Sequence, residues 1–375
     1  MTILFWVSAA LVLYVYAGYP CLVAAWARLV DRQPRRAPFP PERWPSISIV
    51  IAARNEAHRL PARIANLLAQ DYPGSREIIV VSDGSTDAPA TALAPFGPAV
   101  RLIERPSAGK PAALNAGVAA ARGDILVFVD ARQRFAPGSL RALVENFADR
   151  TVGGATGELI LDTEARPSSD STVGEGLGLY WRYEKWMRRS ESRVWSTLGA
   201  TGAIYALRRS LWRPLPESTL LDDVLAPMRA VLAGYRVVFD DRARAYDRAS
   251  SDAATETRRK KRTLAGNYQI LAQEPRLLLP IANPVWLQYL SHKVGRLIVP
   301  WALMALLLSS LLLAGTGAIY VAALAVQVVF YGLAAAGAAL EARQRMSSVA
   351  FTFVVLNFSA IAGLMALRRG REVWR

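Results

Sequence analysis

The stretch Trp44-Pro-Ser-Ile-Ser-Ile-Val-Ile-Ala-Ala53 decides the fold. Its β-branched run predicts a strand that is buried on both faces, as in a parallel sheet. Helical spacing follows over residues 55–70, and an alanine-rich helix is expected over 110–122. Further strands are expected at Glu77–Ser82, Val100–Ile103 and Asp124–Asp130. Strands that alternate with helices imply a doubly wound α/β fold with ligands at the carboxyl ends of the strands.

The composition indicates an integral membrane protein with a large polar part. The chain has 375 residues, of which 53% are hydrophobic, and its mean hydropathy is +0.19. One cysteine excludes an intrachain disulfide framework, and two histidines argue against a multi-histidine metal centre. The 45 basic residues outnumber the 30 acidic ones, giving a net charge of +15. They flank apolar segments, where lipid headgroups explain them, so no nucleic-acid partner is expected.

Three uncharged blocks locate the membrane helices, at residues 1–27, 297–340 and 346–367. About 20 apolar residues cross a bilayer, and Gly315-Thr-Gly317 divides the second block, so four helices are predicted. A cleaved signal peptide is the less favoured alternative for the first block, because no basic segment precedes it. The segment 276–293 is apolar, aromatic and broken by prolines, which favours helices in the membrane interface over a buried hairpin.

The predicted organisation is therefore an N-terminal membrane helix (1–30), a cytoplasmic α/β domain (31–275), interfacial helices (276–293) and a C-terminal membrane region (294–375). Arg28, Arg32, Arg35 and Arg36 follow the first helix and predict that the central domain is cytoplasmic. With four crossings, the basic tail Arg368–Arg371 would lie on the outer side of the membrane, although basic residues favour the cytoplasmic side. Either the apolar block 346–367 bends back without crossing the membrane, or the tail is tolerated on the outer side. Arginine-rich and alanine-rich usage suggests a bacterium and hence its inner membrane.

Acidic and basic side chains at the ends of the expected strands are site candidates. Glu56, Asp83 and Asp130 lie at or just past such ends, although an Asn-Glu helix cap or an Asp-Gly turn would explain the first two. Lys110 follows a glycine at a helix start, which suits a diphosphate group. Asp222 and Asp223 either form an acidic helix N-terminus or supply a general base.

Six short motifs occur in a fixed order: Ile49–Glu56, Val81–Asp87, Gly109–Gly117, Phe128-Val-Asp130-Ala-Arg132, Leu220-Leu-Asp222-Asp223-Val224 and Arg258–Thr263. With membrane helices on both flanks, the pattern over residues 45–273 resembles the processive-type family-2 glycosyltransferases. This family includes cellulose, chitin and hyaluronan synthases and bacterial exopolysaccharide transferases. The resemblance implies a Rossmann-like GT-A fold for the central domain.

The resemblance also assigns roles to residues. Asp223 would be the catalytic base, Asp222 would orient the base or the acceptor, and Asp130 would bind Mg²⁺ or Mn²⁺. Asp-Ala-Arg replaces the usual Asp-x-Asp, which leaves the metal preference open. The nucleotide-sugar would contact Ala53, Arg54, Glu56, Asp83, Lys110, Asp130, Arg132, Arg259 and Arg262. Acceptor contacts are expected from Trp181, Thr201 and Gly202, although an aromatic role in helix packing is favoured for Trp181.

The expected function is inverting, metal-dependent transfer of a sugar from a nucleotide-sugar, most simply UDP-linked, to a growing polysaccharide at the cytoplasmic face. Thr263 replaces the family's acceptor-platform tryptophan, which weakens the case for processive synthesis. Single transfer to a lipid-linked acceptor is a close alternative, and a non-catalytic nucleotide-sugar-binding subunit of a glycan secretion complex is a third. Four helices are few for a polymer channel, which favours a narrow channel, an oligomer or an acceptor taken from the bilayer lipids.

Overall fold

A mixed sheet forms the centre of the polar part of the chain. The computed structural model describes all residues except 37–38, 41–42, 162–172, 248–252, 340–344 and 369–375. Eight strands are ordered β3-β2-β1-β4-β7-β6-β8-β5. Their bounds are β1 Ile47–Ala53, β2 Arg76–Asp83, β3 Val100–Arg105, β4 Ile125–Val129, β5 Arg134–Phe135, β6 Val152–Leu161, β7 Tyr205–Arg208 and β8 Arg236–Asp247. β1 pairs in parallel with β2 and β4, whereas β7 runs antiparallel to β4 and β6.

Helices cover both faces of the parallel half of the sheet. Ile49 of β1 belongs to a core that includes Ile64 and Leu67, whereas Val50 faces a second core that includes Leu114 and Leu225. The predicted burial of β1 on both faces is confirmed. The surrounding helices are α3 Leu60–Leu68, α4 Pro89–Leu93, α5 Lys110–Ala120, α6 Ser139–Glu145 and the short 3₁₀ turns Ala94–Ala99, Asn146–Ala148 and Arg209–Leu211.

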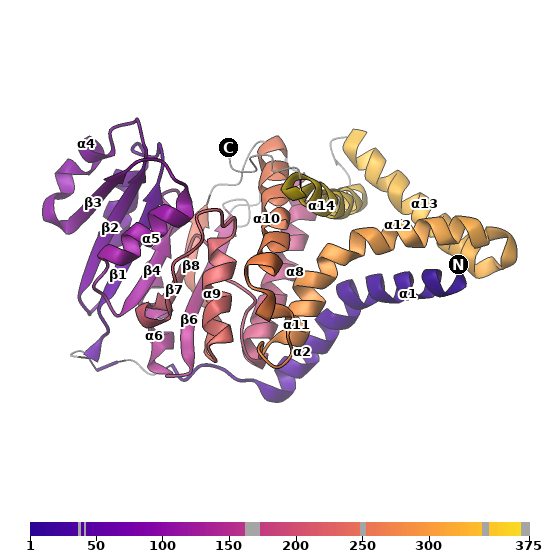
Figure 1. Cartoon of the computed structure of the whole chain (residues 1–375), viewed down its shortest axis with the longest axis horizontal. Coiled ribbons are helices and arrows are strands. Elements are labelled where there is room, and N and C mark those ends of the chain that lie inside the picture. The colour runs from indigo at the N-terminus through magenta and orange to yellow at the C-terminus, as the bar shows by residue number, and fades with distance from the viewer. Residues whose placement is uncertain (37–38, 41–42, 162–172, 248–252, 340–344, 369–375) are drawn as a thin grey trace.

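Further helices lie between the sheet and the apolar helices, as Figure 1 shows. They are α8 Val173–Val194, α9 Asp222–Leu232 and α10 Ala253–Gln273. α9 packs on the sheet through Val224, Leu225 and Met228, which are buried in the second core. Met187 and Val194 of α8 instead pack with residues near the N-terminus of the chain. α8 therefore connects the sheet domain to the apolar helices.

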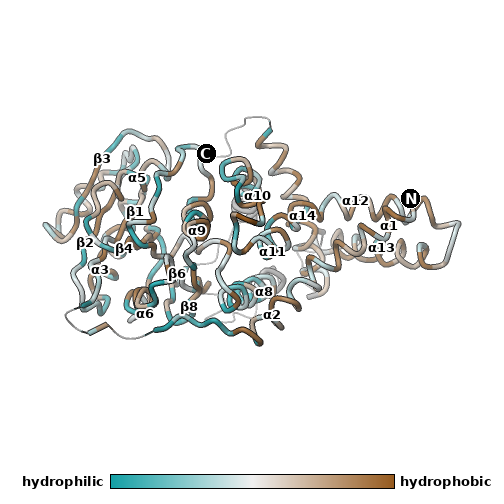
Figure 2. Tube along the Cα trace, turned by 60° about the horizontal axis from the view of Figure 1, so that its bottom comes forward, coloured by the Kyte–Doolittle hydropathy of each residue, from teal (hydrophilic) through white to brown (hydrophobic). Residues whose placement is uncertain are grey.

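Four helical runs are long and apolar enough to cross a membrane: Thr2–Val30, Trp286–Thr316, Ala318–Ala338 and Met346–Arg368. They comprise α1 Thr2–Leu13, a π-helical turn Tyr14–Gly18, α2 Tyr19–Val30, α11 Trp286–Gln288, a π-helical turn Tyr289–Val294, α12 Gly295–Leu313, the 3₁₀ turn Ala314–Thr316, α13 Ala318–Ala339 and α14 Arg345–Arg368. Figure 2 shows this part of the chain as predominantly hydrophobic. The predicted arrangement of one N-terminal and three C-terminal helices is confirmed.

The start of the second apolar helix differs from the expected boundary. A short 3₁₀ helix, Pro275–Leu278, precedes a turn, and from Trp286 the chain is helical without interruption into α12. The segment expected to lie in the interface up to residue 293 therefore contributes its second half to the long helix. Its first half keeps Leu279 and Ile281 exposed. The physical reason is that Pro280 and Pro284 interrupt the helix only before residue 286.

Candidate active site

Three parallel strands end at one edge of the sheet. β1 ends at Ala53, β2 at Asp83 and β4 at Val129, and all three are in parallel register. Asp130 follows β4 directly. The predicted gathering of Asp83 and Asp130 at the carboxyl edge of the sheet is therefore correct.

Asp83 fixes the loop that leads into α5. Its carboxylate oxygens accept hydrogen bonds from the backbone N–H groups of Ala108 (2.9 Å) and Gly109 (2.8 Å), and its side chain is buried. Gly109 has a φ of +94°, which favours glycine, and it places Lys110 at the first position of α5. Asp83 thus shapes the site through its backbone contacts, and its expected bond to a nucleotide base stays a prediction.

The ammonium group of Lys110 lies between two carboxylates. Its Nζ is 3.1 Å from Oδ1 of Asp130 and 3.4 Å from Oδ2 of Asp222. Burial alone would lower the pKa of Lys110, but Asp130, Asp222 and Asp223 together outweigh it and raise that pKa. The side chain is nevertheless 41% exposed. Lys110 is therefore a charged group that a diphosphate can reach from solvent.

Asp223 is held at the first turn of α9, next to Asp222. Its Oδ2 accepts a hydrogen bond from the backbone N–H of Gly202 (3.1 Å), and its carbonyl accepts one from Ala200 (2.7 Å). Burial, and after it the negative charge of Asp222, raise the pKa of Asp223 to about 6. Asp223 thus lies at a helix N-terminus and also belongs to the group of carboxylates around Lys110, namely Asp130, Asp222 and Asp223, which we call the carboxylate cluster. A carboxylate with this pKa is suited to accept a proton near neutral pH.

The loop residue Gly202 faces the Asp223 carboxylate, and Thr201 directly precedes it. A Cβ on Gly202 would lie 3.1 Å from Oδ2 of Asp223, so a side chain there would press on the carboxylate. The hydroxyl of Thr201 accepts a hydrogen bond from Arg188 of α8 (2.7 Å). Arg188 is not among the predicted site residues, because α8 carries several arginines and no motif distinguishes this one.

Several predicted binding residues lie outside this cluster. Glu56 forms an ion pair with Arg59, and Arg54 is exposed. The guanidinium of Arg132 lies 2.7 Å from the carboxylate of Asp247. The charge of Arg132 is thus already paired within the protein, so its expected contact with phosphates requires this ion pair to open and stays a prediction.

The interpretation of Asn55 and Glu56 as a helix start is wrong. α3 begins at Leu60, and Asn55 adopts a left-handed conformation with a φ of +55°. The side-chain oxygen of Asn55 accepts a hydrogen bond from the backbone N–H of Thr86 (2.9 Å). This contact joins the loop after β1 to the loop after β2, so Asn55 organises the edge of the sheet.

The remaining predicted residues lie on α8 and α10. Trp181 is partly buried on α8, with its ring centroid 6.4 Å from that of Tyr180. Arg262 is exposed on α10, whereas the side chain of Arg259 falls outside the described residues. Their expected contacts with acceptor and diphosphate stay predictions.

A divalent cation fits the carboxylate cluster when phosphates complete its shell. Among the described residues, no three His, Cys, Asp or Glu side chains are close enough to hold an ion by themselves. Oδ2 of Asp222 is buried and has no hydrogen-bond partner within the described residues, although it lies near Lys110. Mg²⁺ commonly takes one or two protein carboxylates together with substrate phosphates. Asp130 and Asp222 are the residues that would hold such an ion.

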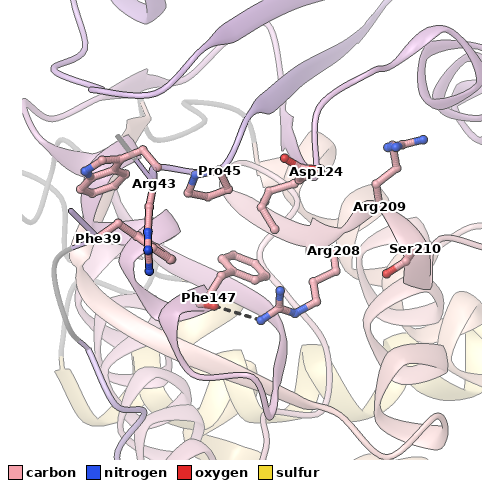
Figure 3. A pocket seen from close by; sticks show the side chains of 10 residues that line it. Phe39, Arg43, Pro45, Asp124, Phe147, Arg208, Arg209 and Ser210 are labelled. Carbon is pink, nitrogen blue, oxygen red and sulfur yellow. Dashed lines mark hydrogen bonds between the residues drawn. The ribbon is translucent and has the colours of Figure 1, made fainter. Parts of the chain in front are cut away.

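A separate cavity of about 560 Å³ lies near the amino ends of β1 and β4 (Figure 3). Aromatic and basic side chains line it, among them Phe39, Arg43 and Arg208. The guanidinium of Arg208 donates to the backbone carbonyls of Phe147 (2.9 Å) and Val152 (2.8 Å). Arg208 thus holds loops together, and the cavity lies at the opposite edge of the sheet from Asp130.

The fold and the site together define an α/β domain of the GT-A type that is attached to apolar helices. The glycosyl transferase family 2 profile matches residues 48–213, which include both Asp83 and Asp130. A fragmentary similarity also links the chain to an N-acetylglucosaminyltransferase of Bradyrhizobium elkanii, 30% identical over 122 residues that cover 31% of this chain and 67% of that one. The chain belongs to glycosyltransferase family 2.

Other relatives share the same region. An N-acetylglucosaminyltransferase of Mesorhizobium japonicum is 28% identical over 45% of this chain and 41% of its own length. A beta-monoglucosyldiacylglycerol synthase of Synechocystis is 30% identical over 41% of this chain and 34% of its own length. The chain thus covers well under half of these two relatives.

One solved structure matches almost the whole chain. It is the mannosyltransferase PcManGT of Pyrobaculum calidifontis, in complex with GDP-Man and Mn²⁺. The TM-score is 0.71 at 23% identity, and the match covers 98% of this chain and 100% of the other. This likeness confirms the fold, including its apolar helices.

Proposed function

We propose that this protein transfers a sugar from a nucleotide-sugar to an acceptor hydroxyl, with inversion at the anomeric carbon and with Asp223 as the general base. The observation that carries the proposal is the placement of Asp223, with a pKa raised to about 6, in one cluster with Lys110, Asp130 and Asp222. Sugar transfer from a nucleotide-sugar needs a base for the acceptor proton and a cationic group for the departing diphosphate. The membership in glycosyltransferase family 2 supports the same reaction class.

The reaction follows from the positions of these groups. The acceptor oxygen attacks the anomeric carbon, its proton passes to Asp223, and the bond from that carbon to the diphosphate breaks. Lys110 binds the diphosphate and opposes the negative charge that develops on it. Because the base and the leaving group act on opposite faces of the sugar, the anomeric configuration inverts. The Gly202 N–H holds the Asp223 carboxylate in place.

A divalent cation belongs to this proposal. Asp130 and Asp222 would hold Mg²⁺ or Mn²⁺, and the ion would neutralise charge on the departing diphosphate. Mn²⁺ together with a nucleotide-sugar is named for the PcManGT structure, which supports a metal here. Since two carboxylates now surround Lys110, this lysine would share them with the ion when the donor binds.

A UDP-linked donor and a growing polysaccharide are our first proposal for the substrates. The names of two relatives support two acceptor classes. One relative is a succinoglycan biosynthesis protein of Rhizobium meliloti, 38% identical over 27% of this chain, and the other is the beta-monoglucosyldiacylglycerol synthase named above. Single transfer to a lipid-linked acceptor is therefore the second candidate. We place the α/β domain on the cytoplasmic side of the bacterial inner membrane because arginines follow the first apolar helix.

The test is nucleotide release by the purified full chain in detergent, with UDP-sugars and GDP-mannose, with Mg²⁺, Mn²⁺ or EDTA, and with or without lipid extract. We expect metal-dependent release with one donor, and an inverted anomeric configuration of the product by NMR. A high-mass product without added lipid would select the polysaccharide acceptor. Release only with lipid extract would select the lipid acceptor. Tight nucleotide binding without release in every condition would instead support the non-catalytic subunit and overturn the proposal.

A further inference from the structure

The cavity at the amino ends of β1 and β4 carries an excess of positive charge. Its volume is about 560 Å³, and its lining includes three arginines, Arg43, Arg208 and Arg209, but a single acidic residue, Asp124. The carboxylate of Asp124 is already engaged, because its Oδ2 accepts hydrogen bonds from the backbone N–H (3.2 Å) and the hydroxyl (2.6 Å) of Ser46. The lining therefore attracts an anion.

The three guanidinium groups keep hydrogen-bond donors available. Among the described residues, no carboxylate oxygen lies within 4 Å of any of them, and the side chain of Arg43 makes no hydrogen bond. Arg209 donates through Nε to the carbonyl of Gly123 (2.8 Å), which leaves both of its Nη groups without a described partner. Arg208 spends Nε and Nη2 on backbone carbonyls, whereas its Nη1 makes no such bond and reaches solvent. Guanidinium donors of this kind suit phosphate oxygens.

Aromatic rings form the apolar part of the same lining. Phe39 is partly exposed, with its ring centroid 5.4 Å from that of the buried Trp44. The guanidinium carbon of Arg208 lies 5.5 Å from the centre of the Phe147 ring. In the view of Figure 3, the Phe147 ring lies between the guanidinium groups of Arg43 and Arg208. Aromatic faces and guanidinium planes are surfaces on which a flat ring stacks.

The size and the chemistry of the lining together select the class of ligand. A volume of about 560 Å³ lies within the range of about 300–1,000 Å³ that small-molecule sites occupy, so a bare phosphate ion would leave most of it empty. A sugar needs many side-chain partners for its hydroxyl groups, but the only polar uncharged side chain in the lining is that of Ser210. A nucleoside phosphate matches both parts of the cavity, with its phosphate at the arginines and its base at the aromatic rings.

The sheet separates this cavity from the carboxylate cluster. β4 begins at Ile125, which lines the cavity, and ends at Val129, directly before Asp130, and every residue of the strand is buried. At about 3.3 Å per residue, Asp124 and Asp130 are about 20 Å apart. A donor bound at the carboxylate cluster therefore does not occupy the cavity, and the two sites are distinct.

We infer that this cavity is a second nucleotide site, which binds a nucleoside phosphate independently of the sugar donor. Arg43 and Arg208 bind the phosphate, and the base lies against Phe39 and Phe147. The role of the site is binding and not catalysis, because the described lining contains no histidine, cysteine or lysine and its one carboxylate is held by Ser46. The inference goes beyond the proposed function and does not depend on it.

The test is titration calorimetry of the full chain in detergent with AMP, GMP, CMP and UMP, and with the matching nucleosides and inorganic phosphate for comparison. We expect saturable binding of at least one monophosphate. Arg43→Met removes a phosphate contact, and Ser210→Trp fills the cavity without a change of charge, so each should weaken binding at least tenfold. Arg43 and Ser210 are both exposed, and thermal unfolding confirms that each variant is folded.

Two further variants serve as controls. Arg122→Met removes an exposed arginine that directly precedes Gly123 but does not line the cavity, so the monophosphate Kd should change by less than about threefold. Lys110→Met weakens the donor site and should leave the monophosphate Kd equally unchanged.

No binding of any of the four monophosphates, or wild-type affinity in both Arg43→Met and Ser210→Trp, would overturn the inference. Binding that is lost in Lys110→Met but kept in both cavity variants would place the probe in the donor site and would also overturn it. Inorganic phosphate that binds as tightly as the monophosphate would refute the contact with the base. A nucleoside that binds as tightly as its monophosphate would refute the contact with the phosphate.

Discussion

Replacement of the proposed base by its neutral isostere, Asp223→Asn, should stabilise the protein while it stops turnover. The pKa of Asp223 is raised from an ordinary 3.8 to about 6 by burial and by Asp222. At pH 8 this pKa shift lowers the free energy of unfolding of the wild-type protein by at most about 3 kcal/mol. The asparagine side chain carries no charge at any pH and can still accept from Gly202.

The stability that Asp223→Asn gains over wild type should increase with pH. The folded protein holds the Asp223 proton more tightly than the unfolded chain, so wild-type stability falls as the pH rises from about 4 to about 6. The advantage of Asp223→Asn is therefore complete at pH 8 and about half as large at pH 5. For a chain of this size, Tm changes by about 2 °C per kcal/mol. The Tm of Asp223→Asn should therefore exceed that of wild type by about 6 °C at pH 8 and by about 3 °C at pH 5.

Thermal unfolding of the purified full chain in detergent measures both values. Asp241→Asn is the control, because this acid is 43% exposed and its variant should shift Tm by less than about 2 °C at either pH. A Tm for Asp223→Asn that is unchanged or lower at pH 8 would show that Asp223 is not a destabilised carboxylate, and would refute the reasoning about its pKa.

Three further predictions concern the same site. The wild-type kcat/KM should fall about tenfold per pH unit below about pH 6, because Asp223 of the free enzyme must be deprotonated to act, and a flat profile from pH 5 to 8 would argue against it. Gly202→Ala places a Cβ 3.1 Å from the Asp223 carboxylate and should lower kcat at least tenfold with an unchanged circular dichroism spectrum. Asp83→Ala leaves two backbone N–H groups without their acceptor, so the donor KM should rise and stability should fall by about 1–3 kcal/mol; wild-type kinetics would contradict the loop-fixing role.

Much of the fold could be predicted because its signals are local. The run from Ile47 to Ala53 is apolar except for Ser48 and contains four β-branched residues, and it lies where a buried central strand must lie. Uncharged blocks of 20 or more residues likewise report membrane helices without tertiary information. The boundary near Trp286 was harder to place, because helix continuity there depends on π-helical turns that leave no mark in hydropathy.

The site could be predicted only where charge coincides with a strand end or a helix start. Asp130, Lys110 and Asp223 satisfy that condition, and the structure brings them together. Arg188 does not, because its importance arises from contacts with Thr201 across the fold. Arg132 shows the opposite error: its sequence position suggests a phosphate contact, but Asp247, more than a hundred residues away, pairs with it. Long-range pairings of this kind are fixed by topology rather than by spacing.

The central claim is that Asp223 is the base for sugar transfer, and a paired measurement of catalysis and donor binding tests it most directly. Wild type and Asp223→Asn are compared in nucleotide release at saturating donor, and in donor affinity by calorimetry, at pH 7.5 with Mn²⁺. We expect release to fall at least a hundredfold while the donor Kd changes less than threefold. Release at the wild-type rate in Asp223→Asn, with donor binding intact, would contradict the assignment.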